Sequence, residues 1–241
     1  MKNIDFHSHI LPGMDDGATD AQVSAGQLVR LKKQGVDRVF LTSHFDFRHE
    51  SKERFIRHRD EAYEKLLQVY DKETMPEVFF GSEIYMARGI GECDFEGLEL
   101  QYTDTVMIEF PREPFGVWMF DLIETLLFER KMKLMIAHVN RVTAAYKKDV
   151  CNSLFDYADL TFQINCEAFR GLIASDPFRG YEVGDLKFVL GTDTHDLGER
   201  APDYDRALKK LQSPRLSYLR ASVEANTEKY NKRIDKNSTT V

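Results

Sequence analysis

The chain has 241 residues, of which 42% are hydrophobic, and its 33 basic and 40 acidic residues give a formal net charge of −7. That length can bury a large core, and an acidic balance without a basic run argues against a nucleic-acid partner. The three cysteines lie far apart and form no Cys-x-x-Cys pair, which indicates reduced thiols. The N-terminus lacks a signal-peptide pattern, and no run approaches the ~18 apolar residues of a spanning helix, so we expect a cytoplasmic protein without membrane insertion.

Short apolar runs alternate with amphipathic stretches along the chain. Periodicity predicts strands at residues 3–6, 36–41, 77–80, 105–108, 133–137, 160–164 and 187–190. Helices are expected from 19–22 to near 35, over about 51–70, from 114 to about 130, and from about 139 to 157. A last helix could start at Ser213-Pro214, residues 89–97 look irregular, and the tail after Arg233 is polar and expected to fray.

This alternation predicts one α/β domain over residues 1–233, followed by a polar tail at 234–241. Alternating strands and helices favour a parallel sheet. Seven such units in about 200 residues predict a closed or nearly closed, seven-stranded TIM-like barrel. The active site of such a barrel lies at the carboxyl ends of its strands.

Potential metal ligands follow nearly every predicted strand. Side chains alternate with a period of two, so His7 and His9 should point to the same side. The remaining candidates at strand ends are His44, Glu83, Glu109, His138, Asp193 and His195. Taken alone, each also fits an ordinary role, such as a core histidine or a carboxylate paired with an arginine. One polynuclear metal site would satisfy all these polar groups together, whereas His49 and His58 are expected to face solvent.

The ligand types narrow the chemistry. Imidazole and carboxylate without thiolate suit manganese, zinc or iron, and the number of donors implies two or three ions. Closely spaced ions favour phosphoryl chemistry. Arg141 and Arg200 lie near the same rim and could bind phosphate oxygens, although either could be an ordinary surface charge. No cysteine-phosphatase spacing, Gly-x-x-x-x-Gly-Lys loop or Gly-x-Ser-x-Gly elbow is present.

The segment from His7 to Gly17, HSHILPGMDDG, resembles the opening motif of the polymerase and histidinol phosphatase superfamily. It is most similar to the manganese-dependent protein-tyrosine phosphatases of bacterial capsule and exopolysaccharide operons. Shorter motifs at residues 42–44, 81–85, 108–110, 137–141 and 193–195 come in the same order as in that family. The resemblance therefore covers nearly the whole chain.

The resemblance implies a distorted seven-stranded barrel that binds three divalent ions, most commonly Mn2+. By this resemblance, the first ion is held by His7, His9, Glu83 and Asp193; the second by Glu83, Glu109 and His138; and the third by Asp16, His44 and His195. Glu83 would bridge the first two ions. Arg141 and Arg200 would bind the phosphate, and Asp15 would cap or orient the loop.

The implied reaction is in-line attack of a metal-bridging hydroxide on phosphotyrosine without a phosphoenzyme, with a metal or a histidine such as His195 assisting the leaving group. The implied substrate is the phosphotyrosine tail of a membrane-associated bacterial tyrosine kinase. Two alternatives stay open: a small-molecule phosphomonoesterase such as histidinol phosphatase, and an inactive metal-binding regulatory module. The sequence departs from the family pattern at Phe45-Asp46 and Val139-Asn140. Asp46 would repel a phosphate if it faced the pocket.

Overall fold

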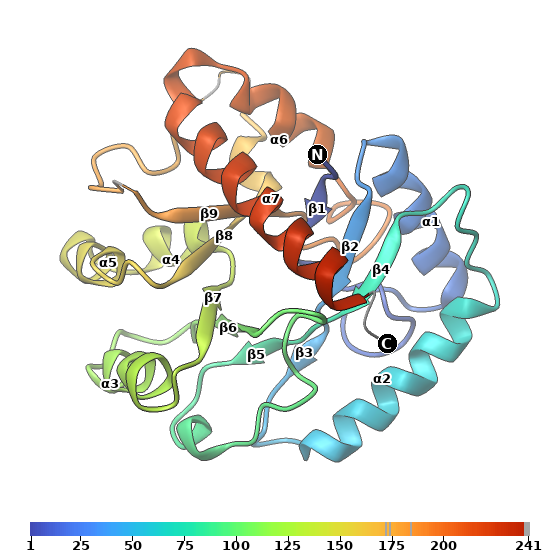
Figure 1. Cartoon of the computed structure of the whole chain (residues 1–241), viewed down its shortest axis with the longest axis horizontal. Coiled ribbons are helices and arrows are strands. Elements are labelled where there is room, and N and C mark those ends of the chain that lie inside the picture. Colours follow the sequence, from blue (N-terminus) through green and yellow to red (C-terminus); the bar gives the residue numbers. More distant parts are fainter. Residues whose placement is uncertain (172, 174, 184, 239–241) are drawn as a thin grey trace.

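The computed structural model describes residues 1–171, 173, 175–183 and 185–238. Its strands are all parallel and form two sheets (Figure 1). The first sheet has the order β1 (Ile4–Asp5), β2 (Arg38–Leu41) and β4 (Glu77–Phe80). The second has the order β3 (His44–Phe45), β5 (Glu83–Tyr85), β6 (Thr105–Glu109), β7 (Lys133–Ile136), β8 (Thr161–Asn165) and β9 (Lys187–Gly191).

The parallel α/β architecture is confirmed, but the predicted count of seven strands is wrong. Within the described residues there are nine, because the second and third predicted runs each lead into a separate short strand, β3 and β5. At both breaks the chain passes from one sheet to the other. Gly81 lies at the second break, where an added Cβ would come within 2.7 Å of Leu100 Cδ2 and 3.0 Å of Thr42 Cγ2. The two sheets approach each other again at β1 and β9, where Phe6 donates its backbone N–H to Leu190 and Asp193 donates to His7.

Both sheets contribute side chains to one shared core. Alternate residues of each strand point to the same face, so every second position can enter it. The cluster contains Ile4, Phe6, Phe40, Phe79, Leu100, Met107, Met135, Ala137, Val189, Tyr230 and Ile234. Fully burying each large apolar side chain contributes roughly 1.5–3 kcal/mol, so this core strongly favours the joined sheets.

The helices are α1 (Ala21–Lys33), α2 (Lys52–Leu67), α3 (Trp118–Glu124), α4 (Val139–Ala145), α5 (Lys148–Phe155), α6 (Tyr204–Leu211) and α7 (Ser217–Ser238). Asp20 caps α1 by accepting the N–H groups of Gln22 and Val23, as the sequence predicts. The helix expected over 139–157 is divided, because Tyr146 has an extended backbone and its hydroxyl donates to Pro111 O at 2.5 Å. The helix expected from 114 begins at 118 and becomes a π turn over Thr125–Glu129, while α6 was not predicted.

Helix α7 covers the amino ends of the strands. Its Tyr230 hydroxyl lies 3.1 Å from Thr105 Oγ1 at the start of β6, and Ser222 Oγ accepts the N–H of Phe188 near the start of β9. The helix continues past Arg233, and Ile234 is fully buried, so the expectation of a frayed tail is wrong for residues 234–238. Residues 239–241 lie outside the described part. None of the described helices combines the length and apolar character that crossing a bilayer requires.

Candidate metal centre

The candidate ligands from separate strands meet in one place. Glu83 Oε2 lies 3.1 Å from His7 Nε2, from His9 Nε2 and from His44 Nδ1. Its other carboxylate oxygen, Oε1, lies 2.8 Å from His138 Nε2. The Glu83 side chain is only 1% exposed. Four imidazoles from three different parts of the chain therefore surround one buried carboxylate.

The hydrogen bonds behind His7 and His9 fix which ring nitrogens face this carboxylate. Nδ1 of His7 donates to Gln163 Oε1 at 2.9 Å, since that oxygen also accepts the His138 N–H and Gln163 Nε2 donates to Asn165. Nδ1 of His9 donates to Asp15 Oδ2 at 2.8 Å. In the neutral rings both Nε2 atoms then carry lone pairs, yet they lie 3.1 Å apart. Only a cation, either a proton or a metal ion, makes this arrangement favourable.

Several buried donors and acceptors in the centre have no hydrogen-bond partner in the described part of the structure. They are Glu83 Oε2, His138 Nδ1 and His195 Nε2; the nitrogens 3.1 Å from Glu83 Oε2 and the Asp16 oxygen 3.3 Å from His195 Nε2 are close but lack hydrogen-bond geometry. Leaving such groups unpaired costs free energy, so their clustering needs an explanation. Divalent ions fit, because the donors are imidazole nitrogens and carboxylate oxygens.

Ligand atoms within 4.8 Å of one another form three groups in the described residues. These groups are His7, His9 and Asp193; His44, Glu83 and Glu109; and His9, Asp16, His44 and His195. They overlap the three implied ligand sets with three differences: Glu83 is absent from the first group, His44 stands in place of His138 in the second, and His9 joins the third. His138 stays within 3.6 Å of Glu109 Oε1, and Asp16 Oδ1 lies 3.3 Å from His195 Nε2.

The field inside the centre shifts the pKa values of its residues. Burial opposes ionisation of Glu83 and Asp193, but the neighbouring histidines outweigh it and hold both carboxyl pKa values well below their usual range. Burial disfavours protonated His138, but Glu109 and Glu83 raise its pKa to about 9. Burial and the nearby charge of His9 lower the pKa of His195 to about 4. Positive charge is therefore favoured beside the carboxylates.

Two candidate ligands have backbones in the left-handed region. His138 has φ 32° and Asp193 has φ 52°, and they are two of the four non-glycine residues with positive φ in the described part. Such conformations cost roughly 1–3 kcal/mol each and persist where surrounding bonds enforce them. Here the His138 N–H is held by Gln163 Oε1 at 2.7 Å, and the Asp193 N–H by His7 O at 2.8 Å.

A layer of supporting residues was missed by the sequence reasoning. Asp5 accepts the backbone N–H groups of His7 and Thr192, and Asn165 donates to Asp193 Oδ2 at 2.9 Å. Gln163 and Asn165 lie two residues apart on β8, so both point to the same side. Two polar residues at alternate positions of a fully buried strand were the available signal. Asp15 orients His9 and also accepts the His44 and Gly17 N–H groups, in agreement with its expected role.

The two arginines reach the same mouth. Arg141 lies 2.7 Å from Asp193 Oδ2, and Arg200 lies 3.2 Å from the same oxygen. Asp46 does not line the pocket described below and pairs with Arg48 at 2.5 Å, while Asn140 Oδ1 accepts the Asn165 N–H. Asp46 and Asn140, two residues that depart from the family pattern, therefore each bind a neighbouring residue. His49, whose side chain is 78% exposed, faces solvent as expected.

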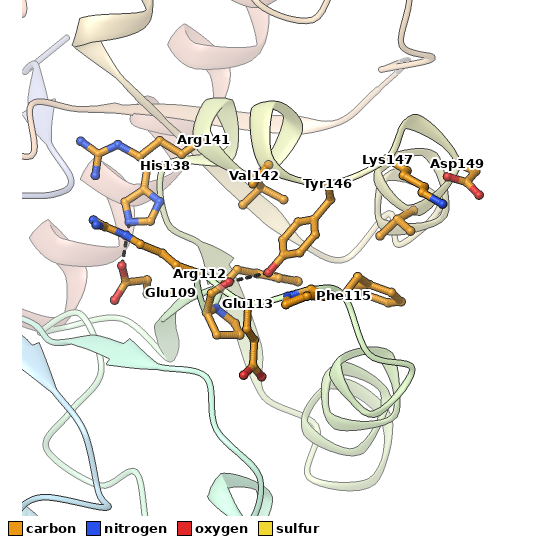
Figure 2. A pocket seen from close by; sticks show the side chains of 15 residues that line it. Glu109, Arg112, Glu113, Phe115, His138, Arg141, Val142, Tyr146, Lys147 and Asp149 are labelled. Carbon is orange, nitrogen blue, oxygen red and sulfur yellow. Dashed lines mark hydrogen bonds and ion pairs between the residues drawn. The ribbon is translucent and has the colours of Figure 1, made fainter.

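A cleft of about 770 Å3 begins at Glu109, His138 and Arg141 and runs outward from the centre. Figure 2 shows its walls: Val142 and Tyr146 on one side, and Arg112 and Phe115 from the loop after β6 on the other. The rings of Phe115 and Tyr146 meet edge to face with centroids 6.0 Å apart. The cleft therefore combines an ionic end with an aromatic wall.

Comparison with known proteins identifies the family. A family model described as "Capsular polysaccharide synthesis, CpsB/CapC" matches residues 3–228. The chain belongs to the CpsB/CapC family. The resemblance to the proteins of capsule operons is thereby confirmed. No curated protein matches the chain.

Among solved structures, the chain is similar to one reported in "Crystal structures of YwqE from Bacillus subtilis and CpsB from Streptococcus pneumoniae, unique metal-dependent tyrosine phosphatases". The TM-score is 0.69 at 23% identity, and the match covers 93% of this chain and 92% of the other. This similarity establishes a shared fold. A mutant organophosphorus hydrolase from Deinococcus radiodurans matches with a TM-score of only 0.41 at 11% identity, over 91% of this chain and 86% of the other, which carries no argument.

Proposed function

We propose that this protein is a metal-dependent protein-tyrosine phosphatase of capsule synthesis. The observation that carries the proposal is the convergence of His7, His9, His44 and His138 on the buried Glu83 carboxylate. Membership of the CpsB/CapC family supports the role in capsular polysaccharide synthesis. The structural similarity to proteins described as metal-dependent tyrosine phosphatases supports the reaction.

In this proposal the centre holds three divalent ions within a distorted barrel built from both sheets; the donor types suit manganese, zinc or iron, and the family resemblance favours Mn2+. The proposed ligands are His7, His9, Asp16, His44, Glu83, Glu109, His138, Asp193 and His195. Divalent ions held there would supply Lewis-acid polarisation of the phosphoryl group and a nucleophile near neutral pH. Asp15 and Gln163 orient His9 and His7 so that their Nε2 atoms face the ions.

Arg141 and Arg200 bind and orient the phosphate in this proposal. Both guanidinium groups now contact Asp193 at the mouth, and a guanidinium can donate two parallel N–H groups to phosphate oxygens. The phosphate would take up bonds that Asp193 now accepts from these arginines. Asn165 would continue to hold Asp193 in place.

The cleft favours an aryl phosphate carried on a polypeptide. Phe115 and Tyr146 offer apolar ring surfaces beyond the ionic end, where the tyrosyl ring and its neighbours would lie. A phenol has a pKa of ~10, so a tyrosyl leaving group needs less protonation than an alkoxide. The matching partner is the phosphorylated tyrosine-rich tail of a membrane-associated kinase, met by a cytoplasmic phosphatase.

The test compares hydrolysis of p-nitrophenyl phosphate, a phosphotyrosyl peptide and histidinol phosphate in the presence of different divalent ions, together with elemental analysis. We expect metal-dependent activity with the peptide preferred, and its loss in a folded His138→Ala variant. A preference for histidinol phosphate would instead identify a small-molecule phosphatase. Bound metal without hydrolysis of any of the three would identify a non-catalytic module.

A further inference from the structure

A second cavity lies at the amino ends of the strands, opposite the candidate metal centre. Its volume is about 280 Å3, which corresponds to roughly nine water molecules at ~30 Å3 each. It is bounded by the residues before and at the starts of β7, β8 and β9 and by the middle turns of α7. In Figure 1, α7 crosses in front of the strands beside β9.

The lining is strongly cationic although the whole chain carries a net charge of −7. One acidic residue, Asp159, lines the cavity. Five positively charged residues also line it: Lys131, Lys133, Lys187, Lys229 and Arg233. Asp104 lies close by and pairs with Lys133 and with Arg233. Even with both carboxylates counted, cations are in excess.

Two of these lysines have no carboxylate partner in the described part of the chain, namely Lys131 and Lys229. Lys187 has only a long contact of 3.7 Å with Asp159, whose side chain is 80% exposed. Partial burial and the charges of Arg233, Lys187 and Lys133 lower the pKa of Lys229. Like charges brought this close repel one another, so an anion placed between them would relieve the repulsion.

The cavity also offers neutral polar groups. Thr161 at the start of β8 and Asn226 on α7 belong to its lining, where the Asn226 amide donates to Ser222 O at 2.8 Å and the Thr161 side chain bonds Tyr230. Lysine and arginine are the usual partners of phosphate oxygens. The cationic lining does not suit a metal ion, and the volume is sufficient for a phosphate group.

We propose that this cavity is a second anion-binding site, which takes a phosphate group from a small phosphate ester or from a lipid headgroup. It is separate from the candidate metal centre, because it lies at the opposite ends of the same strands. It therefore goes beyond the phosphatase reaction and would act as a regulatory or anchoring site.

The experiment titrates the full-length, metal-loaded protein with inorganic phosphate and follows backbone amide NMR shifts. We expect saturable shifts at residues 131–133, 159–161 and 226–233, distinct from those at the metal centre. The double variant Lys187→Gln/Lys229→Gln should raise the phosphate concentration that gives half-maximal shifts roughly tenfold, because two of the converging charges are removed. The matched control Lys65→Gln/Lys72→Gln removes the same charge elsewhere on the surface and should leave them unchanged.

Sedimentation with vesicles distinguishes the sources of the phosphate. Binding to phosphatidylglycerol vesicles that is lost in the Lys187/Lys229 variant identifies a lipid headgroup, whereas phosphate shifts without vesicle binding identify a soluble ester. Neither response, or equal responses in the variant and the wild type, overturns the proposal. Circular dichroism spectra and thermal melts of both double variants should match those of the wild type, which shows that they fold by a readout independent of the proposed reaction.

Discussion

Gln163 Oε1 accepts the Nδ1–H of His7 at 2.9 Å and, with the same oxygen, the backbone N–H of His138 at 2.7 Å. The Gln163 amide thus fixes the ring orientation of His7 and holds the strained backbone of His138. Groups that hold a ligand from behind commonly change metal affinity by 10–100-fold when they are removed.

Replacing Gln163 by leucine should therefore lower metal affinity at least ~10-fold, because His7 loses the acceptor that keeps Nε2 free. Calorimetric titration with Mn2+ of the metal-free protein measures this change. Gln68→Leu, at the exposed carboxyl end of α2, is the control. An unchanged affinity would mean that packing alone orients His7.

Glu83→Gln should lower the hydrolysis of p-nitrophenyl phosphate on the order of 10³-fold, because a neutral amide cannot offset the charge of the proposed metal ions. Metal content by elemental analysis should fall in parallel, while the circular dichroism spectrum should stay native. Glu77→Gln removes a surface carboxylate from β4 and serves as the comparison. Full activity in Glu83→Gln would exclude Glu83 as the shared ligand.

Removal of metal should make stability depend on pH. The pKa of His138 is raised to about 9 in the folded state, so its stabilising contribution is complete below pH ~6.5 and is lost as the pH rises through 9. The shift corresponds to at most about 3 kcal/mol. Urea denaturation of chelator-treated protein should thus show lower stability at pH 9 than at pH 6.5.

Added Zn2+ should reverse this trend, since the metal competes with protons for the same histidines and binds more tightly as the pH rises. The same denaturation series with Zn2+ checks the reversal. If metal-free His138→Asn kept the full loss of stability at alkaline pH, another group would be responsible.

Arg141→Ala should lower kcat/KM for p-nitrophenyl phosphate by roughly 10²–10³-fold with metal content retained, because a charged donor to the phosphate is lost. Arg112 is an exposed residue of the cleft wall and makes no ion pair within the described residues. Arg112→Ala should leave this small substrate within about twofold and weaken only the phosphopeptide. Equal losses for both substrates in Arg112→Ala would place Arg112 at the phosphate itself.

Truncation after Arg233 should destabilise the protein by about 2–5 kcal/mol, because it removes the fully buried Ile234. It also removes Asp235, which pairs with the buried Arg38. Truncation after Ser238, which keeps all of α7, is the comparison. Thermal melts of the two shortened chains measure the difference, and equal melting temperatures would show that the end of α7 contributes nothing.

The positions of the site residues could be predicted because they depend only on where the strands end. Apolar runs of four or five residues followed by His44, Glu109, His138 or Asp193 place those side chains at one edge of any parallel sheet. The division of the candidate ligands into groups came only from the family resemblance and could not be predicted from the residue pattern, because it depends on side-chain directions. His44, for example, faces Glu83 through Nδ1 and Asp16 through Nε2.

The strand breaks were missed for a different reason. Residues 42–43 and 81–82 are small or polar and include no proline that would indicate a break in the strand. Gly81 is the one sequence signal at the crossing between the sheets. The end of α7 was missed because Asn231, Asp235 and Asn237 make it look polar. Their side chains in fact bind Arg38 and the backbone carbonyls of Lys2 and Tyr102.

The proposed ligands extend from His7 to His195, and the first and last strands lie side by side. A nascent chain that still lacks β9 has no Asp193 or His195 to offer, so the complete centre can form only after the last strand has joined the first. Full metal occupancy would then report on whether the two ends of the strand series have come together.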